Sequence, residues 1–191
     1  VVLFSRRLLD HYYNKFGIYG ISHYSSLKLK PNDLSKYHKT KYLLKNAKIS
    51  DINKIQKSYN YTYLKCNGVF YRNYFFWKNL FKRNKLEKNK IELLTENNRF
   101  FGYLIRNKNH IFEVGILPKT NLNKLLKKIN FNKQNTEIDI IQNHPILNYI
   151  NSSDFTISFR QCHYGGHMLK IININKIKKY SKNKFNNTEL S

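Results

Sequence analysis

The positive charge of this chain is spread unevenly along its length. The 191 residues carry a formal net charge of +24. Residues 1–108 hold 23 Lys and Arg against 6 acidic residues, residues 109–169 hold 6 against 4, and residues 170–191 hold 6 against 1. A strongly positive surface repels itself, and staying compact is costly unless an anionic partner neutralises it. The distribution therefore predicts a nearly neutral folded core with a basic first half and a basic tail.

The apolar content indicates that a real core exists. Hydrophobic residues make up 41% of the chain and aromatic residues 15%, which is too apolar for a disordered protein. No stretch approaches the run of about 20 apolar residues that a membrane span needs. Two cysteines form no framework of the kind found in small secreted domains, so a reducing compartment is expected. The abundance of Lys, Asn, Ile, Tyr and Phe indicates an AT-rich genome as the source.

Hydrophobic periodicity in the first half predicts mainly helices. Residues 31–46 have a helical stripe, and a second helix is expected to begin at Ser50. The pair Asn67-Gly68 is typical of a tight hairpin turn between short strands at 61–64 and 69–71. Residues 74–96, where basic and apolar positions interleave, are predicted to be helical.

The second half is predicted to consist mostly of strands. A hairpin is expected from residues 100–106 and 110–116, followed by a helix over 121–129 with its leucines on one face. Strands are predicted at 137–141 and 155–159, and a turn at 163–167 leads into a returning strand. The fold class is therefore predicted to be α+β, an antiparallel sheet with packed helices. The expected division is a basic, mainly helical N-terminal extension (1–60), an α+β domain (61–175) and a basic C-terminal tail (176–191).

Two groups of residues are candidates for metal binding or catalysis. Cys162, His163 and His167 lie in one predicted turn, and with Cys66 they have the donor types of a zinc site, although no Cys-x-x-Cys pair is present. Glu137 and Asp139 are two apart in a predicted strand and should point to the same face. They could hold a metal or share a proton, but a solvated sheet face is the simpler interpretation. The sequence predicts no metal, no cofactor and no enzymatic activity.

Basic residues with aromatic side chains between them suggest a different role. Lysine and arginine neutralise phosphates, and exposed aromatic side chains stack on unpaired bases. The candidate RNA-binding residues are Arg6, Arg7, Lys28, Lys30, Lys39, Lys41, Lys45, Arg72, Lys78, Lys82, Arg83, Lys178, Lys179, Lys182 and Lys184.

In composition, the whole chain resembles ribosomal proteins encoded in the AT-rich mitochondrial genomes of protists. This resemblance implies a structural component of the mitochondrial ribosome that acts in translation. Its basic extensions would position rRNA. The implied partners are rRNA and neighbouring ribosomal proteins, with no small-molecule substrate and a location in the mitochondrial matrix.

Two alternatives remain open on the sequence alone. One is an accessory, non-catalytic subunit of a respiratory complex or ATP synthase, whose basic surface would face acidic lipid head groups or acidic neighbours. The other is a nucleic-acid enzyme whose metal-dependent activity would require Glu137 or Asp139.

Overall fold

The computed structural model describes residues 2–6, 9–20, 24–31, 41–66, 69–129, 136–141, 143–149, 155–161 and 164–169. The elements in chain order are β1 (Val2–Arg6), α1 (Asp10–Asn14), β2 (Tyr19–Gly20), β3 (Tyr24–Pro31), β4 (Leu43–Asn46), η2 (Ile49–Asp51), α2 (Ile52–Tyr63), α3 (Tyr74–Leu86), β5 (Lys90–Glu96), β6 (Arg99–Asn107), β7 (His110–Ile116), α4 (Leu122–Ile129), β8 (Thr136–Ile141), η4 (Pro145–Tyr149), β9 (Phe155–Gln161) and β10 (Tyr164–Leu169).

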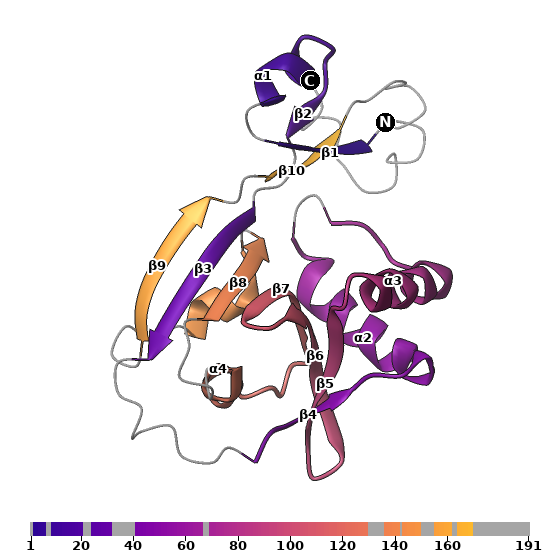
Figure 1. Cartoon of the computed structure of the whole chain (residues 1–191), viewed down its shortest axis with the longest axis vertical. Helices are drawn as coiled ribbons and strands as arrows, with labels where there is room; N and C mark the ends of the chain where they lie inside the picture. Colours follow the sequence, from indigo (N-terminus) through magenta and orange to yellow (C-terminus); the bar gives the residue numbers. More distant parts are fainter. Residues whose placement is uncertain are drawn as a thin grey trace, which may run out of the picture.

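The main sheet contains seven strands in the order β4-β5-β6-β7-β8-β3-β9 (Figure 1). Neighbouring strands are antiparallel except β7 and β8, which run parallel. A smaller sheet, β1-β10-β2, lies beyond one end of the main sheet. The fold is therefore α+β with a mixed, mostly antiparallel sheet.

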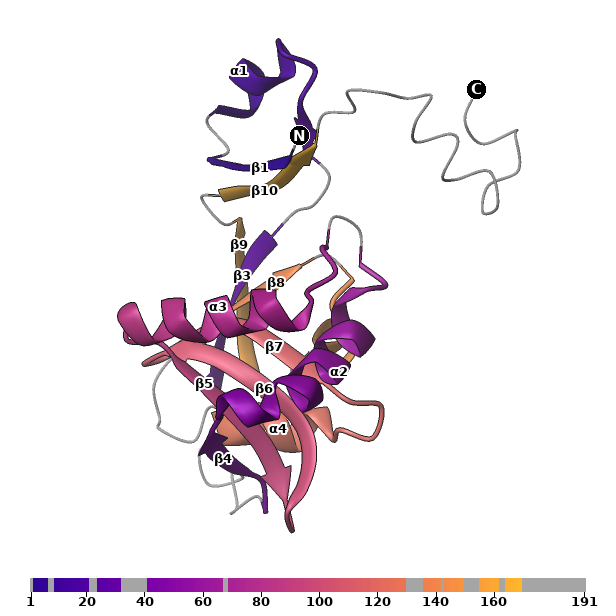
Figure 2. The same ribbon diagram turned by 90° about the vertical axis from the view of Figure 1, so that its right-hand side faces the viewer.

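Helices α2 and α3 cover one face of the main sheet over β5, β6 and β7 (Figure 2). Their buried side chains form one core cluster with the strands, and it contains Ile52, Ile55, Tyr59, Tyr63, Cys66, Trp77, Ile91, Leu93, Tyr103, Ile105 and Ile141. The single tryptophan, Trp77, is fully buried there and packs edge-on against Tyr59 and Tyr103. These two helices are thereby fixed to the middle of the sheet.

Helix α4 packs on the opposite face. Its leucines Leu122, Leu125 and Leu126 are buried against alternate residues of the strands. Because side chains alternate along a strand, Ile138 and Ile140 of β8 point to the α4 side, and Glu137 and Asp139 point to the other. Among the described residues, no helix is long and apolar enough to cross a membrane.

Asparagine side chains and asparagine turns set several of the element boundaries. Asn73 accepts a hydrogen bond from the backbone N–H of Phe76 at 2.8 Å and so caps α3. Asn121 does the same for Lys124 at the start of α4, at 3.0 Å. Between β5 and β6, Asn97 and Asn98 have φ angles of 50° and 60°, which matches a two-residue hairpin turn that needs positive φ at both positions.

Most of the predicted second half is confirmed. The hairpin of β6 and β7, the helix α4 and the strands β8 and β9 all lie where hydrophobic periodicity placed them. The helix expected from Ser50 is also present, with Ile52 and Ile55 fully buried.

Three local predictions in the first half are wrong. Residues 43–46, expected to end a helix, form strand β4. Residues 61–63, expected to be part of the first strand of a hairpin, are the last turn of α2 and contribute Thr62 and Tyr63 to its buried face. Residues 69–71, expected to be the second strand, form no strand, and the predicted turn at 67–68 lies outside the described residues. The helix predicted over 74–96 ends at Leu86, and residues 90–96 form β5, a strand paired on both sides. In each case sheet pairing or helix packing outweighed the local pattern.

The predicted domain division can be compared with the structure only in part. Strands β3 and β4, from the expected N-terminal extension, pair within the main sheet, and position 60 lies inside α2. The expected tail, 176–191, lies outside the described residues. The division stays a prediction.

Candidate active site

The parallel strands β7 and β8 pair only over a short stretch. The paired residues are His110 with Glu137 and Ile111 with Ile138. Directly after them the register between β6 and β7 shifts, so that Phe112 is an extra residue on β7. Such a bulge bends its strand and interrupts pairing. Beyond Ile111, β7 therefore continues without backbone pairing to β8, and the two strands part.

Side chains of this same chain occupy the freed edge of β7. The Tyr63 hydroxyl accepts a hydrogen bond from the Val114 N–H at 3.2 Å, and the Thr62 hydroxyl accepts one from the Ile116 N–H at 2.8 Å. His144, in the segment after β8, bonds the Val114 carbonyl through Nε2 at 3.0 Å. We call Thr62, Tyr63 and His144 the closing triad, because they satisfy the β7 edge where it leaves β8.

His144 is held in one protonation state. The Ile146 N–H donates to His144 Nδ1 at 3.1 Å, so Nε2 carries the hydrogen that is donated to Val114. Burial lowers the pKa of His144 to about 4, although its bond to Val114 acts in the opposite direction. The imidazole is therefore neutral at pH 7 and well suited to a buried backbone contact.

Where β7 and β8 begin, polar side chains gather on the sheet face opposite α4. Asp139 Oδ2 lies 2.8 Å from His110 Nε2, and the side chains of His110 and Asp139 are 36% and 23% exposed. Next to them, the Ser26 hydroxyl donates to Glu137. The His110 ring also packs on Phe112, with ring centroids 4.4 Å apart. The arrangement is an accessible imidazole oriented by a carboxylate, which is a common geometry for a general base.

A second charged cluster lies under α3, and its two charged side chains, Arg72 and Glu113, are only 18% and 14% exposed. Arg72 donates two hydrogen bonds to Glu113, at 2.8 and 2.7 Å, and the Tyr103 hydroxyl also donates to this carboxylate. Burial, together with the charge of Glu113, raises the pKa of Tyr103 well above its usual value. Burial alone would lower the pKa of Arg72, but Glu113 reverses this and the pKa is raised. Glu113 is thus held as a paired carboxylate.

The structure offers no support for a metal site in the part of the chain that it describes. No group of three or more His, Cys, Asp or Glu side chains there is arranged to hold an ion. Cys66 is buried, and burial raises the pKa of its thiol. Cys162 and His163 of the predicted zinc set lie outside the described residues, as does the side chain of its fourth member, His167.

The fold has clear counterparts among solved structures. It is similar to a conserved protein of unknown function from Enterococcus faecalis V583, described as a probable N-acyltransferase, with a TM-score of 0.62 and 14% identity over 91% of this chain and 45% of that one. It is similar to a GCN5-related N-acetyltransferase from Anabaena variabilis ATCC 29413, with a TM-score of 0.58 and 15% identity over 91% of this chain and 46% of that one.

A GCN5-related N-acetyltransferase from Kribbella flavida is also similar, with a TM-score of 0.54 and 8% identity over 87% of this chain and 42% of that one. The fold is that of an N-acetyltransferase. Identities this low establish the fold alone. The chain spans slightly less than half the length of each of these three proteins. No protein-family model and no curated protein matches the sequence.

These likenesses correct the functional interpretation of the sequence. The prediction of a mitochondrial ribosomal protein in translation, with rRNA and ribosomal proteins as partners, is wrong. The predictions of a non-enzyme and of no small-molecule substrate are overturned by the same acetyltransferase-like fold. The alternative of an accessory respiratory subunit is replaced in the same way. The composition gives the net charge of the chain, but a net charge does not determine which fold the chain adopts.

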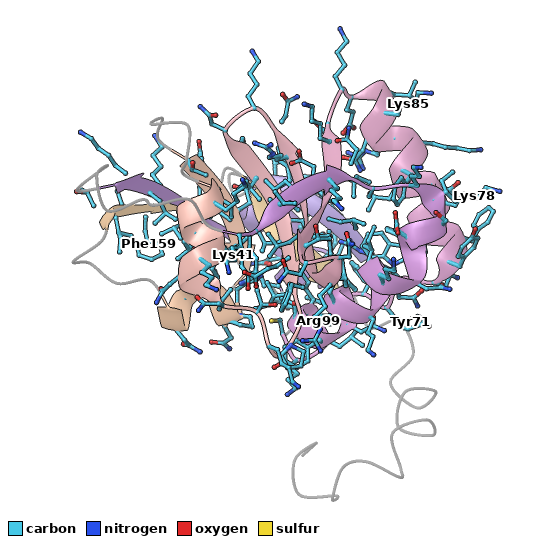
Figure 3. The ribbon with its side chains drawn as sticks, turned by 90° about the horizontal axis from the view of Figure 1, so that it is seen from below. Lys41, Tyr71, Lys78, Lys85, Arg99 and Phe159 are labelled. Carbon is cyan, nitrogen blue, oxygen red and sulfur yellow. The ribbon has the colours of Figure 1, made fainter. Side chains whose placement is uncertain are left out.

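The predicted RNA-binding residues whose side chains the structure describes lie on several different elements. Lys28, Lys30, Lys41, Lys45, Lys78, Lys82 and Arg83 are exposed on several different elements, whereas Arg72 is bound to Glu113. Figure 3 shows Lys41 and Lys78 far apart on the molecule. The side chain of Arg6 is outside the described part, as are Arg7, Lys39, Lys178, Lys179, Lys182 and Lys184 altogether.

The sequence interpretation missed most of the candidate site. It placed Glu137 and Asp139 on one face of the sheet, and the structure confirms this. On that face Glu137 contacts Ser26, and Asp139 contacts His110. It did not single out His110, because that residue is 29 positions away from Asp139 and meets it only through the parallel pairing of β7 and β8. Nothing in the local pattern marked Thr62, Tyr63 or His144 either.

Proposed function

We propose that this chain transfers an acyl group to the amine of a small-molecule acceptor. The observation that carries the proposal is the pairing of His110 with Asp139, 2.8 Å apart, at the point where parallel strands β7 and β8 separate. The likeness of the fold to N-acetyltransferases supports the same reaction class. Because the chain spans less than half of those proteins, its own activity is tested on the 191-residue chain.

His110 would accept a proton from the acceptor amine. An amine acts as a nucleophile only in its neutral form, and a neutral imidazole is the side chain best matched to removing its proton near pH 7. Asp139 would hold the ring in position and stabilise the imidazolium that forms. Ser26 and Glu137, bonded to each other beside this pair, present further polar groups to an acceptor.

An extended acyl donor such as acetyl-CoA does not fit along β7 in the described conformation. The backbone groups of Val114 and Ile116 that would pair with an added extended chain are already bonded to the closing triad. We therefore propose that donor binding requires these side chains to move away from β7.

The uneven charge of the chain is consistent with anionic reactants. We propose that the basic first half and basic tail raise the local concentration of such reactants, an effect that falls as salt is added. This role needs no specific contact from any single lysine.

The test is release of free thiol from acetyl-CoA by the purified chain, measured with a panel of primary amines. We expect turnover with at least one amine, and a fall of about 100-fold or more in kcat for His110→Gln, in the range usual for loss of a general base. Asp139→Asn should lower kcat less and change its pH profile. A fully active His110→Gln, or no turnover and no acetyl-CoA binding by any variant, would contradict the proposal.

A further inference from the structure

A pocket of about 550 Å³ lies on the α3 side of the main sheet, near β4 and β5. Its walls come from three segments: the end of β4 with the start of η2, the second half of α3, and the beginning of β5. The lining residues are Asn46, Ala47, Lys48, Ile49, Phe81, Lys82, Asn84, Lys85, Asn89, Lys90 and Ile91. Strand β6 separates β5 from β7, so this pocket is distinct from the candidate active site.

Four lysines and no acidic residue line the pocket. Lys48, Lys82, Lys85 and Lys90 come from all three wall segments, and none of them takes part in the ion pairs found among the described residues. The nearby acid Glu87 is bonded to Arg83 at 2.7 Å and to Asn89 at 3.0 Å. Four ammonium groups around one hollow repel each other, and a bound anion would relieve that repulsion. Figure 3 shows Lys85 extending from the end of α3.

The remaining walls are apolar or carry fixed amides. Ile49 is 45% exposed, and Phe81, Ala47 and Ile91 lie beside it in the lining. The Asn84 side chain is buried and donates to the Leu80 carbonyl at 2.9 Å, while its oxygen accepts from Asn89 at 3.1 Å. These bonds hold one wall in place before any ligand arrives. The pocket thus combines exposed positive charges with an apolar surface.

We propose that this pocket binds a small ligand in which phosphate groups are joined to an apolar or aromatic part, the chemistry of a nucleotide. Lysine ammonium groups bind phosphates as point charges. Ile49 and Phe81 offer a surface for the apolar part. The volume lies within the range of about 300–1,000 Å³ that is usual for pockets holding small molecules. The proposal does not depend on the acyl-transfer activity.

The first experiment measures ATP binding to the chain by isothermal titration calorimetry at about 0.15 M salt, near physiological ionic strength. We expect Lys82→Gln with Lys85→Gln to weaken binding about tenfold or more. The control pair is Lys57→Gln with Lys78→Gln, which removes the same charge from exposed residues of α2 and α3 that do not line the pocket. We expect less than a twofold change there. Equal losses in the two pairs, or no ATP binding by the unaltered chain, would overturn the proposal.

The second experiment tests the apolar part. Ile49→Ser should weaken ATP binding several-fold but leave the affinity for inorganic tripolyphosphate unchanged, because tripolyphosphate has no apolar group to contact residue 49. The exposure of Ile49 makes this change compatible with folding. Circular dichroism checks that each variant is folded. Unchanged ATP binding, or an equal loss for both ligands, would show that the pocket does not recognise a nucleotide.

Discussion

Arg72 and Glu113 join the segment before α3 to strand β7 through two parallel hydrogen bonds of 2.8 and 2.7 Å. The guanidinium also lies over the ring of Tyr59, 4.1 Å from its centroid. This pair fixes the helical layer to the strand that carries the candidate active site. Arg72, which the sequence predicted to bind RNA, instead forms an ion pair within the protein.

Arg72→Gln should therefore destabilise the protein strongly. It leaves the largely buried Glu113 carboxylate with the Tyr103 hydroxyl but without its charged partner. Breaking a fully buried pair costs about 3–5 kcal/mol, which sets the upper bound for this change. The matched control is Arg83→Gln, which breaks the exposed pair with Glu87 and should cost no more than about 1 kcal/mol. Urea unfolding of the two variants measures the difference. Similar losses would contradict the internal role of Arg72.

Gly115→Ala should be poorly tolerated. A Cβ atom at this position would lie 2.1 Å from the Tyr103 ring, which crosses β7 to reach Glu113. Overpacking of this kind costs about 1–3 kcal/mol or more, because the buried ring has little room to move. Gly20→Ala is the control, since nothing lies within 4 Å of its Cβ position. Thermal unfolding of both variants gives the comparison, and equal melting temperatures would refute the prediction.

Stability should fall as the pH drops from about 6.5 towards 4, partly because of His144. Its pKa is lowered to about 4 in the folded protein, so the unfolded chain takes up this proton first. The stability that His144 contributes is therefore fully present above about pH 6.5 and is lost as the pH falls through this interval. The total loss is up to about 3 kcal/mol. Urea unfolding at several pH values should show a shallower pH dependence for His144→Gln. Identical slopes would show that His144 is not the group responsible.

Tyr63→Phe should improve the binding of acetyl-CoA. The change keeps the ring but removes the hydroxyl that bonds the Val114 N–H, so the closed arrangement loses about 1 kcal/mol or more and the affinity should rise about fivefold. Tyr59→Phe serves as control, because the Tyr59 hydroxyl bonds the Phe70 carbonyl instead of β7. Calorimetric titration with acetyl-CoA measures the affinity of both variants. Weaker binding by Tyr63→Phe would mean that the hydroxyl assists the donor.

Hydrophobic periodicity correctly predicted those helices and strands that bury only one face, with buried side chains at regular spacing. The leucines of α4 repeat at helical spacing and are buried on one face, and Glu137 and Asp139 alternate with buried isoleucines in β8. Such patterns can be recognised in a sequence because the spacing of side chains on one face is a property of the helix or strand itself. The prediction of a helix over β5 is wrong because residues 91–95 are buried on both faces of the sheet and so show no alternation of apolar and polar positions.

The sequence by itself determined the net charge, the presence of a core and the α+β class, since these depend on composition and local period. Only the tertiary structure decided which distant residues meet. The parallel pairing of β7 with β8 brings His110 to Asp139, and the packing of α2 brings Tyr63 to Val114, 51 residues away in sequence. Such contacts depend on strand order and on a single bulge at Phe112, and neither leaves a periodic mark in the sequence.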